Sequence, residues 1–129
     1  DNKLTLDLED DAARGNMGDE WRMPTETECR ELANNTAKTW IKNFKGSGVD
    51  GCKFTSKKDT SKYIFIPATE RYVNGGTGEI GSYGDVWSSS LDTKYEPNSA
   101  FCLGVKEDHL GSFTYGVRSK GRMVRGVRA

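Results

Sequence analysis

The sequence has few cysteines, few prolines and a single histidine, and it lacks a long apolar run. Three Cys, three Pro and one His occur in 129 residues. Three cysteines cannot all pair within one chain, which excludes a full disulfide framework. The longest wholly apolar run, 63–66, is far too short to cross a bilayer. The formal net charge of zero argues against a protein whose main task is to neutralise phosphates, because nucleic-acid binders carry a basic excess.

The composition that remains predicts a small core wrapped in many turns. Hydrophobic residues make up 34% of the chain against 29% charged residues, and there are 15 glycines. Five Tyr, five Phe and three Trp are enough aromatic residues to build a core, which argues against disorder. The length suits one domain over residues 1–129, and no repeat or linker divides it. The charge is uneven: acids dominate 1–31, whereas 109–129 contains five basic residues and no acid.

The strongest local signal is a helix that begins after Pro24-Thr25. Thr25 and Glu28 have the spacing of a capping box, in which each side chain accepts a hydrogen bond from the other residue's amide. Cys29, Leu32 and Ala33 then fall on one helical face, which predicts one stripe packed on the core. We expect this helix to end near Asn34-Asn35.

The rest of the chain reads as short strands separated by turns, apart from one further helical turn. We expect that turn at 9–13, followed by a loop at 15–18. Residues 74–84 hold five glycines and predict a long loop. The strand 63–66 is apolar throughout, which predicts burial on both faces. The expected strands are an alternating segment at Leu4, Leu6 and Leu8, then 21–23, a hairpin of 40–44 with 52–55, then 63–66, 101–105, 113–117 and 123–127. One or two helices with many short strands predict the α+β class.

Two short motifs have a functional and a structural interpretation. Trp87-Ser88-Ser89-Ser90 follows the glycine-rich loop and is typical of a ligand pocket or of a core anchor with hydroxyls that bond loop backbone; we favour the anchor. Glu96-Pro97-Asn98 resembles the calcium- and sugar-binding tripeptide of mannose-type C-type lectins. Nothing after Asn98 supplies the Trp-Asn-Asp tripeptide that completes the lectin site, and a hard cation needs six or more oxygens. We favour a chance tripeptide in a turn.

Residues that carry catalytic or metal chemistry are sparse. His109 has no neighbouring nucleophile motif, so it is not assigned as a catalytic base. Cys29, Cys52 and Cys102 lack the close spacing of a metal site. They are expected to be buried free thiols, or one disulfide with one free thiol. The sequence therefore predicts no catalytic residue, no metal and no cofactor.

The segment 85–120 differs from the rest of the chain because it mixes aromatic, charged and amide side chains on short strands and turns. Such a mixture is typical of a ligand-binding surface, although an ordinary solvated surface explains it equally well. The candidate ligand-binding residues are Asp85, Asp92, Lys94, Tyr95, Glu96, Asn98, His109, Phe113, Tyr115, Arg118 and Lys120. Tyr95, Phe113, Tyr115 and Arg118 are the expected anchors.

Several motifs together resemble the Fibrobacter succinogenes major paralogous domain family. The most specific is the pair formed by Trp-Arg-Met-Pro-Thr at 21–25 and Trp-Ser-Ser-Ser at 87–90, and the likeness extends from about residue 8 to the end. Cys29 departs from the family, whose helix usually has Trp there. The supporting segments are Asp-Asp-Ala-Ala at 10–13, Ile-Phe-Ile-Pro-Ala at 64–68, Gly-Ser-Tyr-Gly at 81–84 and Val-Arg-Gly-Val-Arg at 124–128.

The resemblance implies a C-type-lectin-like fold, related to the formylglycine-generating enzymes and to variable proteins of diversity-generating retroelements. It implies an exported, cell-surface or lipoprotein location in a bacterium or phage. It also implies a strand-rich segment upstream, which we expect this chain to lack. The enzymatic relative needs a close cysteine pair, whereas the C-terminal half here has Cys102 alone. We therefore expect a non-enzymatic domain that displays 85–120 to a protein or glycan ligand. The alternatives are a calcium-dependent lectin and a structural or assembly module.

Overall fold

The structure is a computed structural model of the chain, and it describes residues 5–69, 72–73, 76–77, 83–92, 98–118 and 121–128. Two α-helices and ten strands occur in these residues, together with two short 3-10 helices, Leu8–Asp10 and Phe44–Gly46. The helices are α1 (Ala12–Met17) and α2 (Glu26–Asn35). The strands are β1 (Trp21–Arg22), β2 (Thr36–Ile41), β3 (Gly51–Ser56), β4 (Tyr63–Pro67), β5 (Tyr72–Val73), β6 (Gly76–Thr77), β7 (Tyr83–Leu91), β8 (Ser99–Lys106), β9 (His109–Val117) and β10 (Val127–Arg128).

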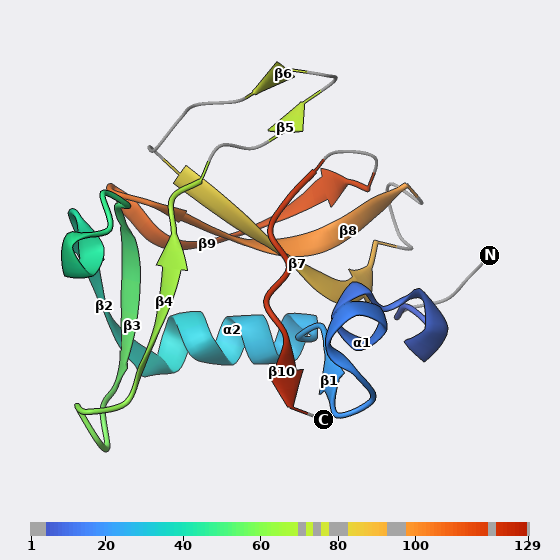
Figure 1. Cartoon of the computed structure of the whole chain (residues 1–129), viewed down its shortest axis with the longest axis horizontal. Helices are drawn as coiled ribbons and strands as arrows, with labels where there is room; N and C mark the ends of the chain where they lie inside the picture. The colour runs from blue at the N-terminus through green and yellow to red at the C-terminus, as the bar shows by residue number, and fades with distance from the viewer. Residues whose placement is uncertain are drawn as a thin grey trace.

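Helix α2 packs against two three-stranded antiparallel sheets. One sheet has the order β2-β3-β4 and the other the order β7-β8-β9. In Figure 1 the β7-β8-β9 sheet lies above α2, and β2-β3-β4 stands at the C-terminal end of the helix. Two-residue strands β1 and β10 pair in front of α2, which brings the chain's first and last described strands together. This arrangement confirms the predicted α+β class.

The predicted capping box and apolar stripe of α2 are both present. The Glu28 amide donates to Thr25 Oγ1 at 3.2 Å, and the Thr25 amide donates to Glu28 Oε1 at 2.9 Å. Cys29 and Ala33 are buried, and Leu32 packs against the core. The helix ends at Asn35, as predicted.

The core lies where α2 meets the two sheets. Its buried members come from α2, from the middle strands β3 and β8, and from β4 and β7: Cys29, Ala33, Cys52, Phe54, Ile66, Val86, Phe101, Leu103 and Val105. Strand β8 is buried along nearly its whole length because strands flank it on both sides and α2 contacts it. The predicted strands within β8 and β9 are confirmed. The predicted pairing of 40–44 with 52–55 is confirmed, but its first strand was misplaced: β2 ends at Ile41, and Phe44 begins a 3-10 helix.

The N-terminal prediction was wrong in its element boundaries. In place of a strand over Leu4–Leu8, Thr5 forms a single bridge with Ser90, and a 3-10 helix begins at Leu8; Leu4 itself lies outside the described residues. The helical turn expected at 9–13 is divided between that 3-10 helix, which ends at Asp10, and α1, which runs from Ala12 to Met17 and so includes 15–17 of the predicted loop. The reason is Asp11, whose side chain caps the helix by accepting from the amides of Ala13 and Arg14.

Two strand predictions were also wrong in part. Strand β4 is not buried on both faces, because it forms the outer strand of its three-stranded sheet: Ile66 is buried and Tyr63 is exposed. Of the strand predicted at 123–127, Val127 alone belongs to a named strand, β10. Met123 forms a single parallel bridge with Val86. Much of the loop predicted at 74–84 lies outside the described residues. Among the described residues, no helix has the length and apolar character that a membrane crossing requires.

Candidate functional site

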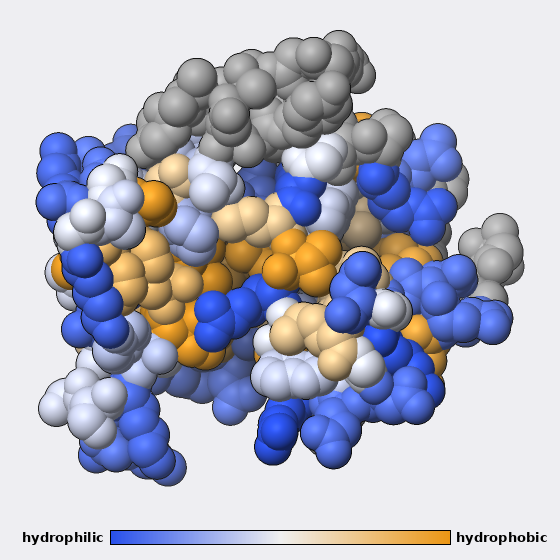
Figure 2. Space-filling view, in the orientation of Figure 1, coloured by the Kyte–Doolittle hydropathy of each residue, from blue (hydrophilic) through white to orange (hydrophobic). Residues whose placement is uncertain are grey.

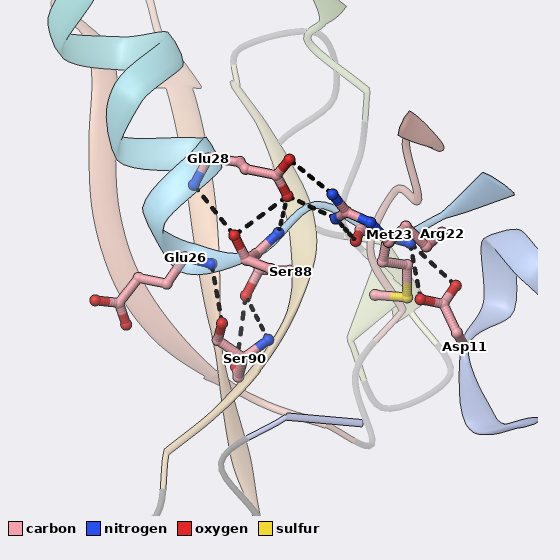
Figure 3. Close-up of polar contacts among 8 residues, drawn as sticks. Asp11, Arg22, Met23, Glu26, Glu28, Ser88 and Ser90 are labelled. Atoms are coloured by element: carbon pink, nitrogen blue, oxygen red, sulfur yellow. Dashed lines mark hydrogen bonds and ion pairs between the residues drawn. The ribbon is translucent and has the colours of Figure 1, made fainter. Parts of the chain in front are cut away.

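The residues of the recognisable motifs hold the N-terminal end of α2 in place. Asp11 caps α1 and also accepts two hydrogen bonds from the Met23 amide, at 3.1 and 2.8 Å, through its two carboxylate oxygens. Asp11 is buried, so these amides replace the water that its carboxylate loses (Figure 3). One carboxylate therefore fixes the strand that leads into Pro24 and Thr25.

Arg22 and Glu28 form a bidentate ion pair beside the capping box. The two guanidinium nitrogens lie 2.6 and 2.9 Å from the two carboxylate oxygens (Figure 3). These hydrogen bonds lower the pKa of Glu28 from its ordinary 4.5 to about 2, with a further contribution from the Thr25 amide. Glu28 is therefore fully ionised at neutral pH, and both its oxygens are occupied by partners.

The serines after Trp87 bond the backbone, as the structural interpretation of this motif predicted. Ser88 Oγ donates to the Phe101 carbonyl oxygen at 2.8 Å. Ser90 Oγ accepts from the Glu26 amide at 2.9 Å (Figure 3). The Ser89 amide donates to the Pro24 carbonyl oxygen. These bonds tie the start of α2 to β7 and tie β7 to β8, so the motif serves the scaffold.

On that scaffold, α2 and β9 form a cluster at the surface that we call the Tyr115 patch: Glu26, Arg30, Phe113 and Tyr115. Arg30 and Tyr115 are exposed, and Glu26 and Phe113 are half-buried. Tyr115 Oη donates to Glu26 Oε1 at 3.0 Å, and Glu26 Oε2 lies 3.1 Å from Arg30 Nε. The Tyr115 ring meets the buried Phe101 ring edge to face, with centroids 5.7 Å apart. Tyr115 is nevertheless 45% exposed. Its aromatic ring is therefore held in one position while much of it faces solvent.

The guanidinium of Arg30 completes the patch by lying over aromatic rings. It is 4.7 Å from the Phe113 centroid and 5.0 Å from the Phe101 centroid, distances at which a cation is attracted to a ring face. Partial burial, reinforced by the hydrogen bond to Glu26, raises the pKa of the Tyr115 hydroxyl above its ordinary value. The hydroxyl is accordingly neutral and donates a hydrogen bond to Glu26.

The structure brings together part of the predicted ligand-binding set. Phe113 and Tyr115 share one face of β9, because side chains two residues apart in a strand point the same way. Asn98 and Arg118 are adjacent at the end of the β8–β9 pair, where the Arg118 amide donates to the Asn98 carbonyl oxygen at 2.7 Å. Arg118 lines a small cavity of about 170 Å³ with Trp87 and Ala100, apart from the patch.

His109 lies at the other end of β9. It is six residues from Tyr115 along the strand, which is about 20 Å at roughly 3.3 Å per residue. The imidazole is 73% exposed and lies 3.5 Å from the Asp108 carboxylate. His109 and the Tyr115 patch therefore do not form one compact site.

The prediction that Asp85 and Asp92 belong to an exposed ligand-binding surface was wrong. Both are buried, with exposures of 8% and 6%. Asp85 forms an ion pair with Arg122, whose side chain is 4% exposed and whose guanidinium lies 4.6 Å from the Trp87 centroid. Two carboxylates held inside the protein contribute no contact surface.

Four candidate residues, Lys94, Tyr95, Glu96 and Lys120, lie outside the described residues. Of the tripeptide Glu96-Pro97-Asn98 that resembles a calcium site, the structure describes Asn98 alone, and Asn98 is exposed. Across the described ranges, no cluster of three or more His, Cys, Asp or Glu side chains has the arrangement of a metal site.

The three cysteines are buried free thiols, which confirms the first of the two expectations for them. Burial raises the pKa of Cys29 to about 12 and that of Cys52 to about 11. Both thiols are protonated at neutral pH and are weak nucleophiles in that form.

Glu26 and Arg30 were not among the predicted site residues. Both lie on the exposed side of α2, four residues apart, a spacing that indicates an ion pair on a helix surface. This spacing in the sequence indicates the ion pair. It does not indicate that the pair lies beside β9, where Tyr115 is 89 residues from Glu26.

Comparison with known proteins gives no relative: no family model, curated protein or solved structure matches the chain.

Proposed function

We propose that this chain is a non-enzymatic ligand-binding domain whose contact surface is the Tyr115 patch. The observation that carries the proposal is a tyrosine that is 45% exposed although Glu26 and Phe101 fix its ring. Binding surfaces concentrate their energy in a few aromatic and arginine side chains, and a ring that is already ordered loses little entropy on binding. Tyr115, Phe113 and Arg30 are residues of these types. Arg30 lies over the Phe113 ring, and Phe101 is contacted by both Arg30 and Tyr115.

The cysteines and the histidine support a binding role over a catalytic one. Cys29 and Cys52 are buried with raised pKa values, so neither is activated as a nucleophile. His109 is exposed and lies beside the Asp108 carboxylate, whereas the three thiols are buried. We place no reaction at the Tyr115 patch.

The proposal also rests on the resemblance to the Fibrobacter succinogenes major paralogous domain family. On that resemblance, we propose that this chain has a C-type-lectin-like fold and an exported or cell-surface location in a bacterium or phage, with a protein or glycan as ligand. The α+β architecture is compatible with that fold. Retroelement diversification of the 85–120 segment is part of the same proposal.

An array of glycans and proteins tests the proposal. The wild-type chain, Tyr115→Ala and Tyr63→Ala should be compared at equal concentration. Tyr63 is the matched control, because it is an exposed tyrosine on β4, in the other sheet. We expect the Tyr63 variant to keep the wild-type signal and the Tyr115 variant to lose it. Equal signals from all three proteins, or no bound ligand for the wild type, would overturn the proposal.

A further inference from the structure

A second feature, distinct from the Tyr115 patch, is an apolar pocket between α2, β4 and the segment 125–127. It has a volume of about 430 Å³. Pockets of roughly 300–1,000 Å³ are the size that small molecules occupy in proteins. Its floor and walls come from α2, β4, β7 and β8: Cys29, Leu32, Ile64, Ile66, Val86 and Leu103. In Figure 2, apolar side chains lie open to solvent between the positions of β4 and β10.

The pocket interior carries no charge. Among the six side chains of the pocket's floor and walls, Cys29 alone is titratable, and burial keeps its thiol protonated. Glu28 also lines the pocket, but its two carboxylate oxygens are bound by Arg22 and by the Thr25 amide. The Arg22–Glu28 pair is neutral as a unit and offers no free charge to a ligand.

Two exposed side chains of opposite sign also line the pocket, Arg125 and Glu31. Neither forms an ion pair with another residue of the described ranges. Of the segment 121–128, only Arg125, Gly126 and Val127 line the pocket. Its other two arginines are paired, Arg122 with Asp85 and Arg128 with Glu20. Arg125 is therefore the group at this wall that can pair with an anionic head group, whereas Glu31 comes from α2.

We infer that this pocket binds a small amphipathic carboxylate, with its aliphatic chain against Leu32 and Ile64 and its carboxylate paired with Arg125. An arginine guanidinium matches a carboxylate with two parallel hydrogen bonds, which a more compact cation does not. Burial of the chain against apolar walls supplies most of the affinity, and Arg125 sets the preference for a negative head group.

Dodecanoate, titrated into the whole chain by calorimetry below its micelle concentration, tests the inference. We expect saturable binding of one molecule per chain. Dodecyltrimethylammonium has the same chain with the opposite charge and should bind more weakly. No saturable binding of dodecanoate, or tighter binding of the cation, would overturn the inference.

Two charge variants make the test independent of folding, since both side chains are exposed. Arg125→Gln should weaken dodecanoate binding by roughly fivefold, the usual size of an exposed ion pair. Glu31→Gln should tighten it, because a like charge is removed. Identical affinities for both variants and the wild type would contradict the assigned head-group contact.

A third variant, Ile64→Trp, narrows the pocket and should abolish dodecanoate binding while the protein still unfolds cooperatively. If Ile64→Trp does not fold, the two charge variants decide the inference. Tyr115→Ala serves as the control that separates this site from the proposed ligand surface. It should bind dodecanoate like the wild type, and a loss there would show that the pocket is not a separate site.

Discussion

Tyr115 on β9 donates a hydrogen bond to Glu26 on the first turn of α2, across 89 residues of sequence. The contact joins the exposed strand of one sheet to the helix that the capping box begins. It fixes an exposed aromatic ring without burying it. The scaffold motifs and the proposed binding surface are therefore coupled, because the bonds that position α2 also position Glu26.

Removing the cap of α2 should weaken the fold measurably. Thr25→Ala loses the hydroxyl that accepts from the Glu28 amide, and we expect the free energy of unfolding to fall by about 1 kcal/mol. Urea unfolding followed by circular dichroism measures it. Thr27→Ala is the matched control, since Thr27 is exposed within the same helix and alanine is the better helix former. Equal losses in the two variants would contradict the capping role.

Stability should depend on acid pH through Glu28. Its folded pKa of about 2 lies below the ordinary 4.5, so the ionised carboxylate stabilises the fold above about pH 4.5. That contribution is lost as the pH falls from about 4.5 to about 2. Glu28→Gln should lose less stability over this interval than the wild type does in urea titrations at successive pH values. Parallel curves for the two proteins would show that the ion pair with Arg22 contributes nothing.

The cysteines should resist alkylation until the protein unfolds. Cys29 and Cys52 are buried with raised pKa values, and Cys102 is buried in β8. We expect iodoacetamide at neutral pH to label none of them within the time that labels all three in urea, as read by mass spectrometry. Rapid labelling of any one in the folded chain would contradict its burial.

The contact between β4 and β7 should not tolerate a side chain at Gly84. A Cβ there would lie 2.3 Å from the Pro67 carbonyl oxygen, a backbone atom that cannot move away easily. Gly84→Ala should therefore lower the free energy of unfolding by about 2–3 kcal/mol in denaturant titrations. Gly15→Ala in α1 is the control, because no atom lies within 4 Å of its Cβ position and alanine favours the helix. The two substitutions should have opposite signs.

Local signals in the sequence predicted α2 well. Its cap, apolar stripe and end depend on residues within one or two turns, and all three were confirmed. The α1 boundary was wrong because Asp11, read as part of a helical turn, acts as the cap that starts the helix. The burial of β4 was wrong because an apolar run does not reveal whether a strand is central or at an edge.

The candidate site was predictable only in part, because its geometry depends on pairings between distant segments. Phe113 and Tyr115 were expected as anchors, and β9 places them on one face. No local pattern predicts that Asp85 is buried with Arg122, since that pair joins residues 37 positions apart. The contribution of Glu26 and Arg30 likewise required knowledge of which helix lies beside β9.

The affinity of Tyr115 variants for the strongest array ligand tests the central claim most directly. Surface plasmon resonance with the wild type, Tyr115→Phe and Tyr115→Ala separates the ring from its hydroxyl. We predict that Tyr115→Ala weakens binding by about tenfold or more, as at other aromatic anchors, whereas Tyr115→Phe retains most of the affinity. If Tyr115→Ala binds as tightly as the wild type, the patch is not the ligand surface.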